Sequence, residues 1–203
     1  MKGKSMWEER YSGSDDYVFG REPARFLQEN PGWIVPGQEV LCVADGEGRN
    51  SVWLAGRGAR LTAFDGAPTA VARAKALAGE AGVAVAHVLC DWAGWDWQRQ
   101  FDLVVAIFIQ FAGPEARAGQ FADLRRAVAP GGVLMLHGYR PEQVALGTGG
   151  PPFEENMYTE PMLAQAFGDW QIQRLASYER EVQEGRGHSG RSALIDLIVR
   201  RPH

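Results

Sequence analysis

The chain is poor in cysteine, histidine and lysine. Its 203 residues include two cysteines, four histidines and three lysines, at positions 2, 4 and 75. Two cysteines, Cys42 and Cys90, do not make a disulfide framework, and we expect both to be small core side chains of a reduced protein. There is no CxxC or HExxH spacing, so the sequence predicts no metal site.

Long apolar runs are also absent. The longest run, residues 103–109, has seven residues, whereas a membrane-spanning helix needs about 20. The lysines at the N-terminus are followed by no apolar stretch, so we expect no signal peptide and a cytoplasmic protein.

The charge is mildly acidic and has no local concentration of one sign. The chain has 21 basic and 25 acidic residues, a formal net charge of −4, and 18 arginines among the basic residues. Without a basic stripe we expect neither nucleic acid nor a membrane surface as a partner. The excess of arginine over lysine is typical of GC-rich bacterial genomes. The length fits a single domain over residues 1–203, with a monomer as the default and a dimer left open.

Apolar runs alternate with helical patterns over residues 39–140. The predicted strands are residues 40–44, 61–64, 83–89, 103–108 and 133–136. The predicted helices are residues 50–55, a segment from Pro68 to near Gly82, and one from Pro114 to near Pro130. This alternation predicts a parallel sheet with helices on both faces.

The two ends of the chain depart from that alternation. Residues 1–30 predict an irregular arm and then a short helix over 22–28, and residues 141–160 predict a long loop. A helix over 162–167 precedes two strand patterns, 171–182 and 191–200, that flank a glycine-rich segment. The sequence therefore predicts an α/β, doubly wound, Rossmann-like and mostly parallel seven-stranded sheet with a C-terminal antiparallel hairpin.

A glycine turn follows the first predicted strand. Asp45-Gly46-Glu47-Gly48 leads directly into a helix, and glycines let a backbone approach a ligand closely. The dinucleotide fingerprint needs a third glycine where Ser51 stands. Asp65 follows 19 residues after Gly46, and a carboxylate there can accept both ribose hydroxyls of an adenosine. The plain alternative is a tight turn with a helix-capping aspartate.

The third predicted strand also ends in an acid. Asp91 is placed to accept an adenine amino group while Trp92 covers the ring, and the alternative is a loop aspartate beside a core tryptophan. Trp92, Trp95 and Trp97 lie within six residues, so we expect at least two of them to be packing anchors.

These motifs resemble those of class I S-adenosylmethionine-dependent methyltransferases. The resemblance lies in Glu47-Gly48-Arg49-Asn50, Phe64-Asp65 and residues 101–104 and 130–132. The N-terminal segments 7–11 and 17–23 and the C-terminal segments 147–151 and 179–190 are similar to the small tellurite-resistance branch, TehB-like. The resemblance implies an S-adenosylmethionine cofactor, an arm or lid over 1–30, a cofactor-binding half over 31–140, and a substrate-side loop and closing hairpin over 141–203.

Three positions depart from the family pattern. Cys42 replaces the acid that helps to hold the cofactor's amino group, and Ala44 replaces the first glycine. Our hypothesis is that Asp45 supplies the missing negative charge from a shifted position. Gln110 replaces a histidine often seen in the family, so no role of that histidine carries over.

The turn and the resemblance together give a set of candidate site residues. For the cofactor they are Tyr11, Tyr17, Ala44, Asp45, Gly46, Gly48, Asn50, Asp65, Gly66, Asp91, Trp92 and Ile107. For the acceptor they are Gln110, Tyr139, Arg180 and His188. A positive or switchable group suits an anionic acceptor, which favours Arg180 and His188. The alternatives are a solvated strand charge and a hairpin-tip residue. Tyr11, Tyr17 and Phe19 would attract the sulfonium if the arm is a lid, or would simply pack.

We therefore expect an enzyme that transfers a methyl group to a small molecule, of the thiol or chalcogen-oxyanion type. One alternative is a non-catalytic S-adenosylmethionine-binding or regulatory protein. Another is a nicotinamide-dependent reductase, against which the absent third glycine and the lack of a Tyr-x-x-x-Lys pair argue.

Overall fold

The computed structural model describes residues 2–185 and 187–203, which divide into two compact units. Unit 1 holds the described residues of Met1–Asp96 and Glu184–Arg186, and unit 2 those of Trp97–Gln183 and Gly187–His203. Arg186, in the predicted hairpin turn, lies outside the described residues. The prediction of a single domain over 1–203 stays a prediction.

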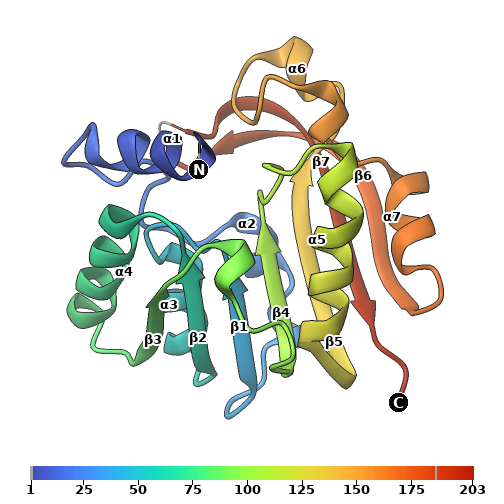
Figure 1. The fold of residues 1–203 in the computed structure, drawn as a ribbon, viewed down its shortest axis with the longest axis horizontal. Helices are drawn as coiled ribbons and strands as arrows, with labels where there is room; N and C mark the ends of the chain where they lie inside the picture. Colours follow the sequence, from blue (N-terminus) through green and yellow to red (C-terminus); the bar gives the residue numbers. More distant parts are fainter. Residues whose placement is uncertain (1, 186) are drawn as a thin grey trace. The chain divides into compact units, whose positions relative to one another are not determined.

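Unit 1 contains three parallel strands and the helices that follow them (Figure 1). Its elements are α1 (Lys2–Ser12), α2 (Arg25–Glu29), η1 (Pro31–Trp33), β1 (Glu39–Val43), α3 (Arg49–Gly56), β2 (Arg60–Asp65), α4 (Pro68–Glu80), β3 (Val85–Leu89) and η2 (Trp92–Gly94). Val43 pairs with Phe64, and Asp65 pairs with Leu89. The carboxyl ends of the three strands therefore meet at one edge.

The N-terminal arm corrects one prediction. Residues 2–12 form the helix α1 rather than an irregular segment. Trp7 and Tyr11 stand four residues apart and stack with their ring centroids 6.0 Å apart, a helical spacing that the sequence analysis missed among the charges. The carboxylate of Glu8 accepts hydrogen bonds from the backbone N–H and the hydroxyl of Thr69, which fixes α1 at the first turn of α4.

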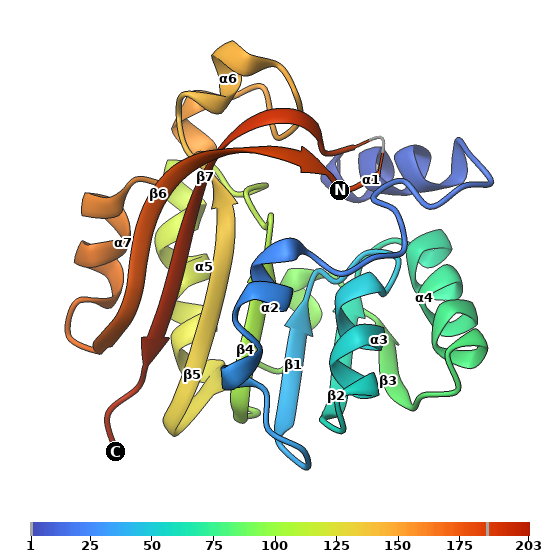
Figure 2. The ribbon, with the colours of Figure 1, turned by 180° about the vertical axis from the view of Figure 1, so that it is seen from behind.

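Unit 2 contains a parallel strand pair continued by a long antiparallel hairpin (Figure 2). Its elements are β4 (Phe101–Ile107), α5 (Pro114–Ala127), β5 (Val128–Tyr139), α6 (Gln143–Leu146), η3 (Glu154–Asn156), α7 (Glu160–Phe167), β6 (Gln171–Gln183) and β7 (Ser189–Arg200). The rings of Phe121 on α5 and Phe167 on α7 lie 5.3 Å apart. The fifth strand begins earlier than predicted. The helix α5 already ends at Ala127, and residues 130–132, which were expected to end the helix, belong to β5.

Numbered along the chain, the seven strands have the order β3-β2-β1-β4-β5-β7-β6. The pairs β1–β2, β2–β3 and β4–β5 are parallel, and β7 pairs antiparallel with both β5 and β6. The predicted fold class, a mostly parallel α/β sheet with a C-terminal antiparallel hairpin, is confirmed.

The two cysteines differ in their surroundings. Cys42 is buried in β1, where burial raises the pKa of its thiol well above the ordinary value, whereas Cys90 is half-buried and its Sγ lies 3.3 Å from the carbonyl oxygen of Asp91. The core prediction is therefore confirmed for Cys42 alone. Among the helices in the described part of the chain, none has the length and apolar character that crossing a membrane requires.

Candidate functional site

The glycine turn after β1 has an unusual backbone. Ala44, Gly46 and Gly48 all have positive φ, at 47°, 62° and 88°. Gly48 begins α3, and a Cβ there would lie 2.7 Å from the Cβ of Ala74, so no larger residue fits. Ala44 holds a left-handed conformation that costs a residue with a Cβ about 1–2 kcal/mol. Such strain gathers at functional sites, and Phe108, directly after β4, has it as well.

Asp65 ties the end of β2 to this turn. Its Oδ2 accepts a hydrogen bond from the backbone N–H of Gly46 and its Oδ1 one from Ala67, both at 2.9 Å. Burial raises the pKa of Asp65, and the two backbone N–H groups act in the opposite direction. A carboxylate has about four acceptor positions, so Asp65 keeps lone pairs with which to accept ribose hydroxyls.

The end of β3 lies beside the end of β2. A Cβ on Gly66 would touch Asp91 at 3.6 Å. Asp91 is exposed, and its Oδ1 accepts from the N–H of Gly94, so it caps η2. Trp92 is half-buried, with its ring centroid 6.2 Å from that of Phe64.

The other two tryptophans are packing anchors. Trp95 and Trp97 are 7% and 8% exposed, and Trp95 stacks on Phe64 with centroids 4.6 Å apart. The prediction that at least two of the three tryptophans are anchors is confirmed.

The side chains of the glycine turn face the N-terminal arm. Glu47 accepts from the backbone N–H of Val18 at 2.7 Å, and the Oδ1 of Asn50 accepts from the N–H of Ala24 at 2.9 Å. The side-chain oxygen of Asn50, a residue predicted to touch the cofactor, is therefore hydrogen-bonded to the arm. These side chains therefore hold the arm against unit 1.

Two buried ion pairs complete this attachment. Arg73 of α4 pairs with Glu47 at 2.7 Å and donates to carbonyl oxygens of Ser14 and Asp16. Arg49 pairs at 2.7 Å with Glu184, which returns to unit 1 from far along the chain. No local pattern in the sequence predicts these ion pairs and hydrogen bonds, since their partners lie up to 135 residues apart.

Of the arm's aromatic side chains, Tyr11 lies at the turn. A Cβ on Gly46 would lie 2.8 Å from the hydroxyl of Tyr11, and burial, followed by the charges of Asp65 and Glu47, raises the pKa of this phenol. Phe19 packs on Tyr11 edge to face, 6.2 Å away. Tyr17 instead lies on α4, where its hydroxyl donates to the carbonyl oxygen of Arg73.

In unit 2, Gln110 braces the end of β5. It is 3% exposed; its Oε1 accepts from the backbone N–H of Tyr139 at 2.6 Å and its Nε2 donates to the same residue's carbonyl oxygen at 2.8 Å. A Cβ on Gly138 would lie 2.6 Å from the Gln110 amide oxygen, so a larger residue there would displace the Gln110 side chain. These contacts describe a side chain that positions Tyr139.

Tyr139 and His188 form a buried pair. The Tyr139 hydroxyl is hydrogen-bonded to His188 Nδ1, and the imidazole stacks on Phe108 with centroids 4.2 Å apart. His188 is only 6% exposed, so it is not a solvated hairpin-tip residue. The structure thus brings together three of the four candidate acceptor residues, since Gln110 contacts the backbone of Tyr139 and His188 contacts its hydroxyl.

A second imidazole, missed by the sequence analysis, lies beside Phe108. His137 on β5 is buried, and its Nδ1 lies 2.7 Å from Oδ1 of Asp196 on β7. Arg174 donates to Oδ2 of Asp196 at 2.8 Å. Burial alone would raise the pKa of Asp196. The hydrogen bonds and charges of His137 and Arg174 outweigh burial, so the pKa of Asp196 is lowered. Ile107, predicted for the cofactor, ends β4 and pairs with His137.

Arg180, a candidate for the acceptor, and Arg21, on the N-terminal arm, lie in different units. Arg180 on β6 lies over the ring of Tyr178, 5.1 Å from its centroid. Arg21 pairs with the exposed Glu80 and lies over Tyr17, so it is bound at the outer end of α4.

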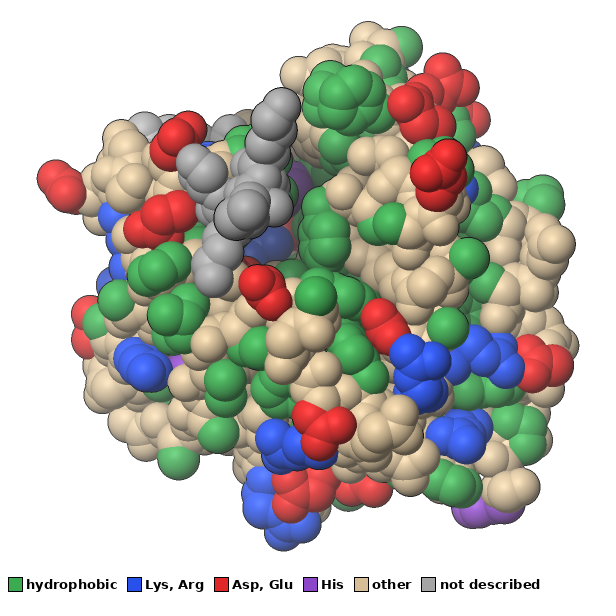
Figure 3. Space-filling model, in the orientation of Figure 1, with side chains coloured by type: hydrophobic (Ala, Val, Ile, Leu, Met, Phe, Trp, Pro, Cys, Tyr) green, Lys and Arg blue, Asp and Glu red, His purple; other side chains and the backbone are tan. Residues whose placement is uncertain are grey.

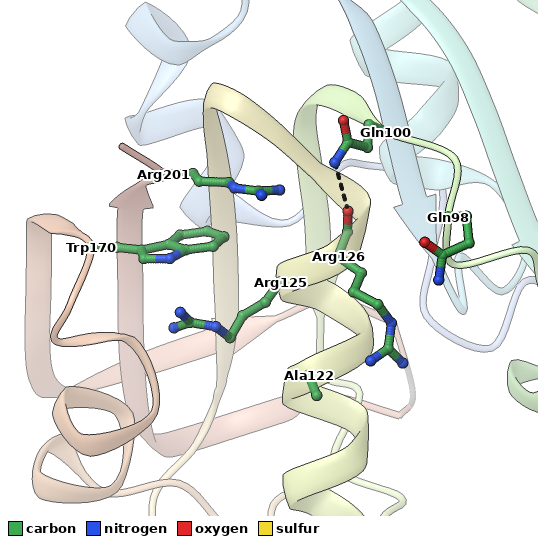
Figure 4. A pocket seen from close by; sticks show the side chains of 7 residues that line it. All are labelled: Gln98, Gln100, Ala122, Arg125, Arg126, Trp170 and Arg201. Atoms are coloured by element: carbon green, nitrogen blue, oxygen red, sulfur yellow. Dashed lines mark hydrogen bonds between the residues drawn. The ribbon is translucent and has the colours of Figure 1, made fainter. Parts of the chain in front are cut away.

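Unit 2 also has a hollow of about 440 Å³ between α5, Trp170 and the C-terminal segment (Figure 4). It is lined by Gln98, Gln100, Ala122, Arg125, Arg126, Trp170 and Arg201. Arg125 pairs with Asp169, Arg126 pairs with Asp123, and Arg201 donates to the carbonyl oxygen of Val128. These guanidinium groups are engaged in holding the structure.

The described residues contain no cluster of three or more His, Cys, Asp or Glu side chains suited to a metal ion. On the face in Figure 3, basic side chains stand next to acidic ones.

The comparisons with known proteins agree with this geometry. Residues 40–132 match the family described as "Methyltransferase domain", whereas no curated protein matches the sequence. Among solved structures, 98% of the chain superposes on 91% of a protein from work on the conversion of a disulfide bond into a thioacetal group during echinomycin biosynthesis, at 18% identity and a TM-score of 0.79.

Two further structures are similar at 16% identity. The N-methyltransferase NodS of Bradyrhizobium japonicum, in complex with S-adenosyl-L-homocysteine, matches 98% of this chain over 99% of its own, with a TM-score of 0.72. TehB of Haemophilus influenzae matches 96% over 67%, with a TM-score of 0.71. The chain therefore has the α/β fold of these methyltransferase structures, and residues 40–132, which include the glycine turn and Asp65, match a methyltransferase domain.

Proposed function

We propose that the protein is an S-adenosylmethionine-dependent methyltransferase that acts on a small-molecule acceptor. The observation that carries this proposal is the 2.9 Å hydrogen bond from Gly46 N–H to Asp65, which joins a glycine turn and a ribose-binding acid at neighbouring strand ends. The domain match over 40–132 and the NodS complex with S-adenosyl-L-homocysteine support the choice of cofactor.

The residues of unit 1 fit such a cofactor. Asp65 would hold the ribose hydroxyls, Gly46 and Gly48 would let the backbone come close, and Tyr11 would cover the turn. The cofactor, when bound, supplies an activated methyl group whose transfer leaves a thioether that needs no proton. The protein's task is then to position and desolvate the acceptor.

Unit 2 carries the groups that we assign to the acceptor. A thiolate or oxyanion needs no base, whereas a protic acceptor must lose a proton. His137, whose Nδ1 lies 2.7 Å from Oδ1 of Asp196, is the imidazole that we assign to receive that proton. Tyr139 and His188 would orient the acceptor through their paired hydroxyl and imidazole.

Calorimetry and turnover test the proposal together. We expect S-adenosylmethionine and S-adenosyl-L-homocysteine to bind and NADH not to bind, and S-adenosyl-L-homocysteine to form with a thiol, selenite or tellurite as acceptor. Binding of NADH alone would favour a reductase. Binding without turnover on every acceptor would favour a regulatory protein.

The Tyr139→Phe and His188→Ala variants test the assignment in unit 2. We expect each to lower turnover by about 10²-fold, the scale on which a misplaced reactant slows a reaction, without a change in affinity for S-adenosyl-L-homocysteine. Glu142→Gln, which changes an exposed residue at the start of α6, is the control. Full turnover by the His188→Ala variant would remove that residue from the site.

A further inference from the structure

The hollow of about 440 Å³ in unit 2 has a basic lining (Figure 4). Three of its seven lining residues are arginines, two are glutamines, and the other two are Ala122 and Trp170. Among the described residues, no aspartate or glutamate lines it. Its volume lies within the range of about 300–1,000 Å³ that is typical of small-molecule sites. The hollow therefore has the room and the sign of charge for a small anion.

This hollow lies at the opposite end of β4 from the groups that we assign to the acceptor. Gln98 and Gln100 come just before β4, and Arg201 follows the end of β7, which runs antiparallel to β5. Gln110, in contrast, comes after the far end of β4. The seven residues of β4 span about 20 Å, at about 3.3 Å per residue. A molecule in the hollow would therefore be a second ligand and not the methyl acceptor.

The three guanidinium groups of the lining are compensated to different degrees. Arg125 pairs with Asp169 through two nitrogens, and Arg126 pairs with Asp123. Arg201 has no carboxylate partner in the described part of the chain. Its side-chain hydrogen bond there runs from Nη1 to a backbone carbonyl oxygen at 2.6 Å. Arg201 therefore brings an uncompensated positive charge to the hollow.

The Arg201 side chain also keeps hydrogen-bond donors for a ligand. A guanidinium group has five N–H donors, and the bond from Nη1 uses one of them. The donors lie in one plane and match two oxygens of a carboxylate or a phosphate. Arg201 can thus hold a backbone carbonyl oxygen and an oxyanion at the same time.

The walls of the hollow are held in place by the protein itself. Arg125 lies over the ring of Trp170, 4.7 Å from its centroid, and Trp170 is only 8% exposed. Figure 4 shows Arg201 on the same side of the hollow as Trp170, and the two glutamines on the other side. Gln100 donates from Nε2 to the carbonyl oxygen of Arg126 at 3.5 Å, which turns its amide group toward α5. Such pre-ordered walls lower the entropy cost of binding.

We propose that this hollow binds a small molecule that carries a phosphate or carboxylate group. The oxyanion would accept hydrogen bonds from Arg201 and neutralise its charge. The amide oxygen of Gln100 would accept a hydrogen bond from a hydroxyl or amino group of the same ligand. The inference does not depend on the proposed methyltransferase activity, because no residue of the hollow belongs to the glycine turn or to the acceptor candidates.

Calorimetry on the full chain in physiological salt tests the proposal with two probes. Pyrophosphate represents the phosphates and citrate the carboxylates. We expect at least one of them to bind with a dissociation constant of about 1 mM or lower. Arg201→Gln should weaken that binding by at least about tenfold, the cost of losing a charged hydrogen-bond donor.

Arg99→Gln is the matched control. It removes the same charge from an exposed residue that stands between the two glutamines in sequence but does not line the hollow. We expect it to weaken binding by less than about twofold, because salt screens exposed charges. Equal weakening by Arg99→Gln and Arg201→Gln would show a general attraction of anions and would overturn the proposal.

Trp170 reports where the probe binds. The ¹H–¹⁵N signal of its indole, identified with the Trp170→Phe variant, should shift when the probe that binds is added. A Trp170 signal that stays in place at saturation would put the anion elsewhere on the protein and would overturn the proposal.

A second variant covers the case in which Arg201→Gln does not fold, as circular dichroism would show. Gln100 is exposed, and Gln100→Glu places a negative charge in the hollow. We expect it to weaken binding by at least about tenfold, because like charges repel. Unchanged affinity in this variant, or no binding of either probe to the wild type at millimolar concentration, would overturn the proposal. Neither result bears on the proposed function, which binding of S-adenosyl-L-homocysteine tests separately.

Discussion

At the scale of single residues, the glycine turn combines strain with close packing. Glycine is required at position 48 for two reasons: its φ is positive, and a side chain there would overlap Ala74. Ala44 also has positive φ, and it stands where the family that the sequence resembles has a glycine. The strained alanine fixes the direction in which the chain leaves β1 and enters the segment that holds Asp45.

Exchanging the two residue types tests this view. Gly48→Ala should lower the free energy of unfolding by more than about 2 kcal/mol, because left-handed strain adds to overlap with Ala74. Ala44→Gly should change it by less than about 1 kcal/mol, because relief of strain offsets the greater entropy of the unfolded chain. Urea unfolding measures both. A Gly48→Ala variant as stable as the wild type would show that the turn can relax.

At the scale of elements, the arm is fixed by the same segment that forms the turn. Residues 14–24 are held by the buried pair of Glu47 and Arg73 and by Asn50, while α1 is fixed to α4 through Glu8. The arm is thus a bound cover of unit 1. Its position depends on the Glu47–Arg73 ion pair, which is largely shielded from water.

Removing Glu47 should release the arm. Glu47→Ala leaves Arg73 without its partner and the Val18 N–H without its acceptor. We expect a loss of about 3 kcal/mol, the low end for a broken buried pair, because Arg73 keeps some contact with solvent. Hydrogen exchange of amides 14–24 should rise. Glu39→Ala, which breaks an exposed pair with Arg60, is the control and should cost less than about 1 kcal/mol. Unchanged exchange in the Glu47→Ala variant would mean that the remaining contacts, including those of Asn50 and Glu8, are enough to hold the arm.

At the scale of the whole molecule, the sequence predicted most elements because the strand and helix patterns are local. It also predicted that Asp65 and the glycine turn belong to one site, because their spacing follows from strand–turn–helix geometry. The pairing of His137 with Asp196 could not be predicted, since the two residues are 59 positions apart and nothing local marks them. The pair of Arg49 and Glu184 escaped prediction for the same reason.

The most direct test of the account is a crystal structure of the protein with S-adenosyl-L-homocysteine. The account predicts the ribose hydroxyls on the carboxylate of Asp65 and the backbone of Gly46–Gly48 against the ligand. A ligand bound away from this turn, or the turn left without ligand at saturating concentration, would contradict the account.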